Sequence, residues 1–371
     1  MSSQKSIQER LLMEEHFYDL LAQLPDITDL YAPDDPTELQ EVVSKLERMA
    51  ALKNLPEPEQ QPTSHTKLAP IIPIRPIEEN ERLFVEQNFG MEFPVCVASK
   101  KDRRRLTSLE YNNSDGGKYV LAREANGALP APEHNPLWQW ALMKFSIAAR
   151  QVAHIPLSTA VPAPKVGVDV RELARLLERS AGGSFYDFVD DAFKSFAGIT
   201  VTATNVVYDA KTKRRRKSIG KMHLIEYQSW REEADELEGE QLAYYEPVAS
   251  LSWIQPSNFL WENIRANFVL PITSIRELAQ MSYVAQRLTA WLKKHGQTQP
   301  RDGWFATTLL KKIPLKLRSY DIKSKLRKPH SELMALSVLL SEPEYSGRGQ
   351  DIKIKYHINS AFLKTPAKIE D

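Results

Sequence analysis

The fold class is decided by residues 169–204, which read DVRELARLLERSAGGSFYDFVDDAFKSFAGITVTAT. Asp169 and Glu172 stand at the spacing of a capping box, which predicts a helix over residues 169–179. After a tight turn that contains two glycines, apolar side chains recur at intervals of three and four residues and predict a second helix over 184–196. Two helices joined by so short a turn are typical of a helix-turn-helix unit.

Two strand-like segments follow the second helix. Residues 199–204 and 222–227 are rich in β-branched and other apolar side chains, so we expect them to pair as a β-hairpin. Upstream, a turn rich in Gly and Asp predicts another hairpin over 111–120, and a long helix is expected over 135–153. A helix, a helix-turn-helix and a β-hairpin in this order make a winged helix, and we place this first domain at residues 83–230.

The same order of elements recurs in the C-terminal part of the chain. Ser274 and Glu277 form another capping box, which predicts a helix over 274–294. Further helical segments and a glycine-rich turn follow, and the turn leads into a strand over 351–357. We therefore expect an α+β fold with two winged-helix domains, the second over residues 257–371. The shorter helical segments lie near 307–313, 320–328 and 329–340.

An added acidic helical module is predicted at residues 1–54. A proline-rich linker follows over 55–82, and an acidic linker at 231–256 separates the two winged-helix domains. Residues 1–60 contain 13 Asp and Glu but only 5 Lys and Arg, a net charge of −8, which leaves +9 for the rest of the chain. This asymmetry favours a polyanionic partner, although solvated helix faces would give the same balance.

Three clusters of Lys and Arg are the candidate DNA-binding residues. The first would lie at the tip of the hairpin and follow a phosphate backbone, with a solubilising loop as the alternative. Because the predicted helix 184–196 carries three acids on its solvent face, we expect the hairpin rather than this helix to contact phosphates. The first cluster consists of Lys211, Lys213, Arg214, Arg215, Arg216, Lys217 and Lys221. The second, around the second helix-turn-helix, consists of Lys311, Lys312, Lys316, Arg318, Lys323, Lys325, Arg327 and Lys328. The third consists of Lys100, Lys101, Arg103, Arg104 and Arg105.

Aromatic residues are numerous on the predicted helices. The phenylalanines between residues 185 and 196 follow helical spacing, which favours core packing over a stacking platform for single strands. Trp138 and Trp140 stand two positions apart on the helix 135–153, so they should face different ways. We expect one of the two to be exposed or to lie at a domain interface.

The sequence lacks the motifs of common catalytic and metal sites. It contains no Gly-x-x-x-x-Gly-Lys-Ser/Thr loop and no His-x-His pair beside a downstream tyrosine. Cys96 is the single cysteine, which excludes an internal disulfide and a zinc finger and favours a reducing cytosol. No window approaches the roughly 18 apolar residues of a membrane span, and the N-terminus lacks the pattern of a secretory signal. We expect a cytoplasmic, non-enzymatic protein without a cofactor, metal or membrane contact.

Patterned positions between about residues 90 and 340 stand in a consistent order. They lie at 103–106 (RRRL), 135–140 (NPLWQW), 192–201 (AFKSFAGITV), 257–261 (SNFLW) and 284–292 (VAQRLTAWL). In these segments the chain resembles the replication initiator protein A family of bacterial plasmid initiators. The resemblance implies tandem winged helices that bind double-stranded DNA at repeated origin sequences and recruit host replication proteins. The acidic module 1–54 lies outside it and is expected to be regulatory.

Two other functions fit the same fold. A transcriptional repressor would differ in its genetic setting, because an initiator gene should lie beside iterated repeats on a plasmid or episome. A protein–protein adaptor would differ in its response to salt, because only DNA binding loses affinity steeply as salt rises. The sequence leaves a homodimer open.

Overall fold

The computed structural model describes most of the chain from residue 71 onward. The described ranges are 42–43, 71–72, 74–112, 117–125, 127–229, 252–313, 315 and 317–364. The chain divides into two compact units, Met1–Leu68 and Ala69–Asp371, and the helices and strands named below belong to the second. The predicted module 1–54, apart from residues 42–43, most of the proline-rich linker and most of the acidic linker lie outside the described residues.

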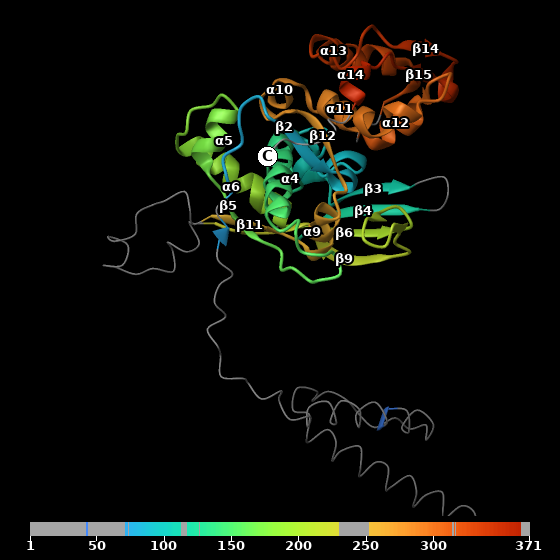
Figure 1. Cartoon of the computed structure of the whole chain (residues 1–371). Coiled ribbons are helices and arrows are strands. Elements are labelled where there is room, and N and C mark those ends of the chain that lie inside the picture. The colour runs from blue at the N-terminus through green and yellow to red at the C-terminus, as the bar shows by residue number, and fades with distance from the viewer. Residues whose placement is uncertain are drawn as a thin grey trace, which may run out of the picture. The chain divides into compact units, whose positions relative to one another are not determined.

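The first group of elements surrounds a central helix. In chain order it consists of α4 (Asn135–Gln151), β5 (Lys165–Gly167), α5 (Val170–Leu176), α6 (Gly183–Ala197), β10 (Ile225–Gln228) and β11 (Trp253–Pro256) (Figure 1). The last strand lies between the other two, in the order β5-β11-β10, and β1 (Ile71–Ile72) adds to β5 in parallel. Both helices of the predicted helix-turn-helix are present.

The predicted hairpin after α6 is divided between two sheets. β6 (Ile199–Thr204) pairs antiparallel with β9 (Ile219–His223), as predicted, but within a separate sheet of order β3-β4-β6-β9. The predicted return strand 222–227 is therefore divided between two strands. Its first part belongs to β9, which ends at His223, and its second part belongs to β10, which begins at Ile225. The physical reason is that Leu224 and Ile225 are consecutive and both buried, so the chain passes from one sheet to the other between them.

The partner hairpin in that sheet agrees with the prediction for residues 111–120. β3 (Ser108–Asn112) pairs antiparallel with β4 (Lys118–Arg123), and Asn112 stands opposite Lys118 at the turn. Tyr111 and Tyr119 are buried on the inner face of this sheet, where they stand opposite each other. Cross-strand aromatic pairs of this kind stabilise a register.

The C-terminal group repeats the order of the first. It consists of α11 (Tyr283–His295), β13 (Trp304–Phe305), α12 (Ala306–Lys312), α13 (Ile322–Ala335), β14 (Glu344–Ser346) and β15 (Lys353–Lys355). Its sheet has the order β13-β15-β14, so the last strand again lies in the middle. This group has a hydrophobic core of its own, which contains Leu288, Leu326 and Ile354.

Two helix predictions in this part were wrong in detail. The predicted helix 274–294 is divided into α10 (Ile275–Gln280) and α11, with Met281 and Ser282 extended between them. The capping box of Ser274 and Glu277 is present at the start of α10. The predicted boundary at Pro329 is absent, because α13 continues through this proline with Pro329 and His330 buried on its inner side.

Segments assigned to linkers contribute to the fold. The end of the acidic linker, residues 253–256, forms β11, and Ile77 of the proline-rich linker is fully buried. β2 (Arg82–Glu86) pairs with β12 (Val269–Ser274), so strands from both predicted domains share one ladder. The two groups of elements are therefore connected by strand pairing as well as by the covalent chain.

A buried arginine connects the two groups. After β2 the chain forms a short π-helix, η1 (Gln87–Glu92), and Arg287 of α11 donates to the carbonyls of Gly90 and Met91 at 3.1 and 2.8 Å. Glu92 completes the junction by accepting from Lys294, His295 and Lys312.

The prediction that one tryptophan of α4 is exposed was wrong. Trp138 and Trp140 are both fully buried, because α4 is covered on all sides and only its last two residues, Arg150 and Gln151, are not buried. The phenylalanines of α6 pack in the core as predicted, with Phe185, Phe193 and Phe196 buried. Among the described residues, no helix combines the length and apolarity required to cross a membrane.

Candidate nucleic-acid interface

The first predicted cluster lies on a short ribbon that leaves β6 and returns to β9. β7 (Tyr208–Asp209) and β8 (Arg214–Arg215) pair antiparallel, and residues 210–213 form the turn between them. Lys213 takes a left-handed conformation in this turn, with φ of 54°. The cluster is therefore built into a defined β-turn-β structure beside the four-stranded sheet.

Three cations of this ribbon and one on the adjoining strand β9 have no charge partner among the described residues. Their side chains are exposed, and none of these side chains makes a hydrogen bond or ion pair with another residue that the structure describes. Uncompensated positive charge on one structural element attracts a polyanion. We name this set the ribbon surface: Lys213, Arg214, Lys217 and Lys221.

Two other cations of the cluster bind to the protein itself. Arg216 Nε and Nη2 both lie 2.7 Å from Asp209 Oδ2, and its guanidinium stacks 4.9 Å from the ring centroid of Phe259. Lys211 Nζ lies 3.3 Å from Glu262 Oε2. These contacts separate two partnered cations, Lys211 and Arg216, from the four unpartnered ones, although the partnered side chains are still 45% and 50% exposed. Arg215 is also exposed, on β8.

The second predicted cluster lies mainly on α13. Its inner side buries Ile322, Leu326 and Leu333, and the opposite side exposes four cations. Lys328 has a carboxylate nearby, at 3.8 Å from Glu332. We use the name helix surface for the four exposed cations of α13 together with an exposed cation that precedes the helix. Its members are Arg318, Lys323, Lys325, Arg327 and Lys328.

The remaining cations of the second cluster separate in the same way. Lys311 is exposed on α12, whereas Lys312 is tied to Glu92 at 2.6 Å and lies over the ring of Phe93. Lys312 therefore joins the two groups of elements. Lys316 lies outside the described residues.

Arg348 is an exposed cation that the site prediction omitted. It stands in the turn between β14 and β15, beside Gly347, whose φ of +81° is typical of glycine. A Cβ atom at residue 347 would lie 2.3 Å from the carbonyl oxygen of Asp351. The glycine-rich turn in the sequence was the signal that could have identified this position.

The third predicted cluster is largely occupied by contacts within the protein. Arg103 Nη2 lies 2.5 Å from Asp191 and 2.8 Å from Ser195 Oγ on α6, and Arg105 lies 2.5 Å from Asp102. Arg104 is exposed without a partner among the described residues. Of the predicted triplet, Arg104 alone is left with an uncompensated charge in the described part of the chain.

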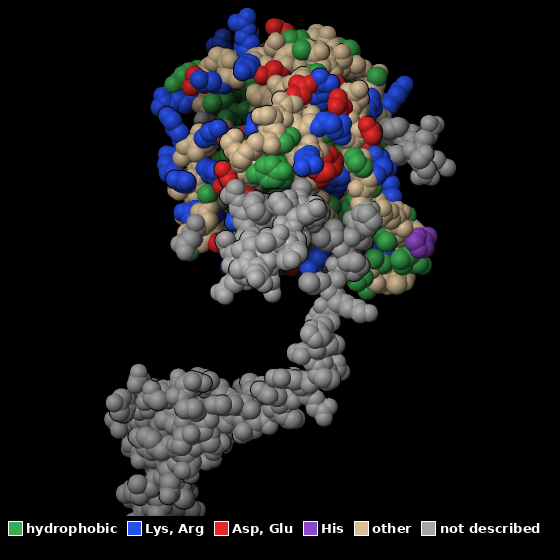
Figure 2. All heavy atoms as spheres, turned by 90° about the vertical axis from the view of Figure 1, so that its left-hand side faces the viewer, with side chains coloured by type: hydrophobic (Ala, Val, Ile, Leu, Met, Phe, Trp, Pro, Cys, Tyr) green, Lys and Arg blue, Asp and Glu red, His purple; other side chains and the backbone are tan. Residues whose placement is uncertain are grey.

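Two of the three acids on α6 have partners of this kind within the protein. Asp191 pairs with Arg103, and Asp190 accepts from the Tyr227 hydroxyl at 2.9 Å and from Lys194 at 3.3 Å. Figure 2, which views the side of the molecule that carries α5 and α6, shows cationic and anionic side chains interspersed. Among the described residues visible in this view, charges of both signs therefore lie side by side.

The described residues offer little for redox or metal chemistry. Cys96 is buried, and burial raises the pKa of its thiol, so the thiol stays protonated at neutral pH. Within the described ranges, no three His, Cys, Asp or Glu side chains are arranged to hold a metal ion.

Comparisons with known proteins give a low level of similarity. No family model and no curated protein matches the chain. The solved structures similar to it include a selenomethionine derivative of domains 2 and 3 of RctB, with 13% identity and a TM-score of 0.42 over 71% of this chain and 94% of that one. Another structure of RctB domains 2–3 has 12% identity and a TM-score of 0.35 over 68% and 83%. Because both TM-scores lie below 0.5, this likeness establishes neither a shared fold nor a shared function.

Proposed function

We propose that this chain binds double-stranded DNA through the ribbon surface and the helix surface, and that it acts as a replication initiator at repeated origin sites. The observation that carries DNA binding is the helix surface, where five cations gather on and beside α13. A helix is about 10–12 Å across with its side chains, which suits a major groove about 12 Å wide.

The order of elements supports the interpretation of the C-terminal group as a winged helix. In a winged helix the third helix enters the groove, and the hairpin that follows contacts the backbone beside it. In this chain those roles would belong to α13 and to the β14–β15 hairpin with Arg348. The first group has the same order, but the acids of α6 make its third helix a poor match for phosphate.

The initiator role is supported by the sequence resemblance to plasmid initiators. It predicts that footprinting on DNA flanking the chain's own gene will give several protected sites at a regular spacing. A single protected site over a promoter would indicate a repressor instead.

Salt dependence provides the test of DNA binding. The full chain would be titrated against a labelled duplex by fluorescence anisotropy between 50 and 300 mM salt. Each phosphate contacted adds about −0.9 to the slope of log affinity against log salt, so one contact for each of the nine cations in the two surfaces would give a slope near −8. Binding that is weak at every salt concentration would contradict the proposal and favour an adaptor.

A matched pair of variants assigns the contact to α13. The double variant Lys323→Gln/Arg327→Gln should reduce the steepness of the slope by about 1.8, because two phosphate contacts are lost. The control Arg171→Gln/Lys364→Gln removes the same charge from exposed positions outside both surfaces. Equal effects of the two doubles would show that net charge alone governs the affinity.

A further inference from the structure

A buried carboxylate lies at the base of the ribbon. Asp209 is only 3% exposed, and its Oδ1 accepts from the backbone N–H groups of Lys211 and Thr212 at 3.0 and 3.1 Å. Its Oδ2 contacts two nitrogens of the Arg216 guanidinium, Nε and Nη2. Burial alone would raise the pKa of Asp209, but the bonds from Thr212 and Arg216 outweigh it and the pKa lies below its usual value. The carboxylate thus fixes both arms of the turn.

Two buried asparagines hold the same strand from outside. Asn263 of α9 (Asn258–Arg265) accepts from Ala210 N at 2.9 Å and donates to the carbonyl of Tyr208 at 3.2 Å. Asn88 bonds to both backbone groups of Tyr208, at 2.8 and 3.2 Å. Both asparagines are 1% exposed, so this anchor is shielded from water.

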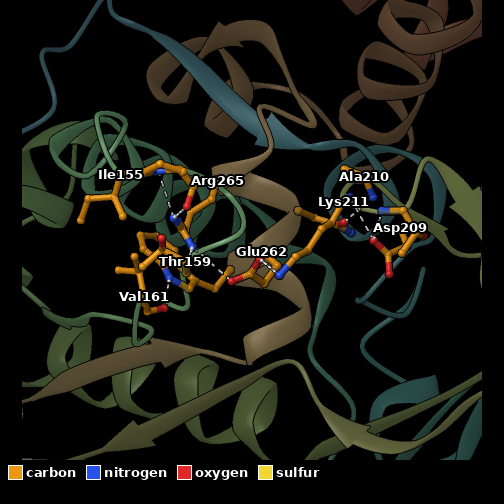
Figure 3. A network of polar contacts seen from close by, with 12 residues as sticks. Ile155, Thr159, Val161, Asp209, Ala210, Lys211, Glu262 and Arg265 are labelled. Atoms are coloured by element: carbon orange, nitrogen blue, oxygen red, sulfur yellow. Dashed lines mark hydrogen bonds and ion pairs between the residues drawn. The ribbon is translucent and has the colours of Figure 1, made fainter.

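Helix α9 adds an ion pair on its outer side. Figure 3 shows Glu262 between Arg265 and Lys211, and the nearest atoms of the two pairs lie 3.2 and 3.3 Å apart. Arg265 also donates to the carbonyls of Thr159 and Ile155. The two partnered cations of the ribbon, Lys211 and Arg216, therefore contact a helix that is itself held in place.

From this geometry we infer that Asp209, Arg216 and Asn263 are positioning residues, which hold the ribbon surface ready for the phosphates of duplex DNA. The inference rests on the proposed function. Its consequence is that the predicted run of seven cations contains two kinds of residue. Arg214 contacts phosphate, whereas Arg216 acts through Asp209 and contacts none. A surface that is ordered before binding avoids the entropy cost of ordering on binding.

Arg214 and Arg216 provide a matched pair for the test. Each changes to glutamine with the loss of one positive charge, from positions two residues apart on the same ribbon. Arg214→Gln should reduce the steepness of the salt slope by about 0.9, the value of one phosphate. Arg216→Gln should weaken binding about fivefold at every salt concentration and leave the slope unchanged. Arg216→Lys keeps the charge but has one nitrogen, so it should recover only part of the affinity.

Trypsin digestion of the free protein separates the two hypotheses. Cleavage within residues 211–217 should be slow in the wild type and in Arg214→Gln, and at least fivefold faster in Arg216→Gln and Asp209→Asn. Equal cleavage of wild type and Arg216→Gln would overturn the positioning role even if DNA binds. A slope change of about 0.9 in Arg216→Gln would overturn it too, because Arg216 would then be a phosphate contact. If the wild type is cleaved slowly but binds no DNA, the proposed function is overturned, and only the conclusion that these residues anchor the ribbon stands.

Discussion

Replacement of Lys144 by methionine should destabilise the fold by about 3–5 kcal/mol. Lys144 on α4 lies 2.8 Å from Glu172 on α5, and both side chains are only 4% exposed. Methionine has a similar volume, so little packing is lost. The carboxylate of Glu172 would remain buried without its cation, and an uncompensated buried charge has this cost in other proteins. The bond from Lys144 to the carbonyl of Arg75, at 2.9 Å, is lost as well.

The measurement is equilibrium unfolding of the full chain in urea at pH 7, followed by tryptophan fluorescence. Lys118→Met is the control, because its ion pair with Glu110 is 3.5 Å long and about half exposed on both sides. That control should shift the free energy of unfolding by less than about 1 kcal/mol. If Lys144→Met is as mild as Lys118→Met, the reasoning from burial is refuted.

Three further predictions concern pH, backbone strain and a reassigned arginine. Burial lowers the pKa of His330 to about 4 from 6.5, so the unfolded chain binds more protons between these values. Stability present above pH 6.5 should therefore fall as the pH approaches 4, and in urea titrations at several pH values His330→Gln should remove about 3 kcal/mol of that fall. Gly347→Ala should cost about 1–3 kcal/mol in the same unfolding assay, because alanine is strained at a φ of +81°. Gly182→Ala, where a Cβ meets nothing within 4 Å, is its control. Arg103→Gln should cost only about 0.5–1.5 kcal/mol, because Ser195 loses its donor while Asp191 is 48% exposed and can bind water. It should keep the wild-type salt slope in the DNA titration, and a change of about 0.9 would mark Arg103 as a phosphate contact.

Local sequence patterns predicted those elements whose cause is local. The apolar spacing between residues 184 and 196 gave α6, which the structure places at Gly183–Ala197. The capping box at Ser274 is present, and the Gly- and Asp-rich turn gave the β3–β4 hairpin. These signals act over one or two helical turns or across one tight turn, so they can be recognised without knowledge of the partner elements.

Local pattern failed where a residue's partner is distant in the sequence. Asp169 caps α5 as expected, but Glu172 does not complete the capping box, because its carboxylate turns inward to Lys144. The partner of Asp191 on α6 is Arg103, which lies 88 positions away in the sequence. Residues 222–227 are divided between two sheets because β9 pairs with β6 and β10 pairs with β11, and the local sequence does not reveal these partners.

The sequence by itself determined that the chain contains both helices and strands and where its main turns lie. It also determined that cations gather at residues 211–221 and 318–328. Only the tertiary structure decided which of those cations are available to a partner. Arg214 and Arg216 are the same residue type in the same run, and both are exposed. Among the described residues the side chain of Arg214 has no partner, whereas that of Arg216 is bound to Asp209. The reason is that charge and periodicity are properties of neighbouring residues, whereas burial and pairing depend on contacts between segments that the chain brings together only when it folds.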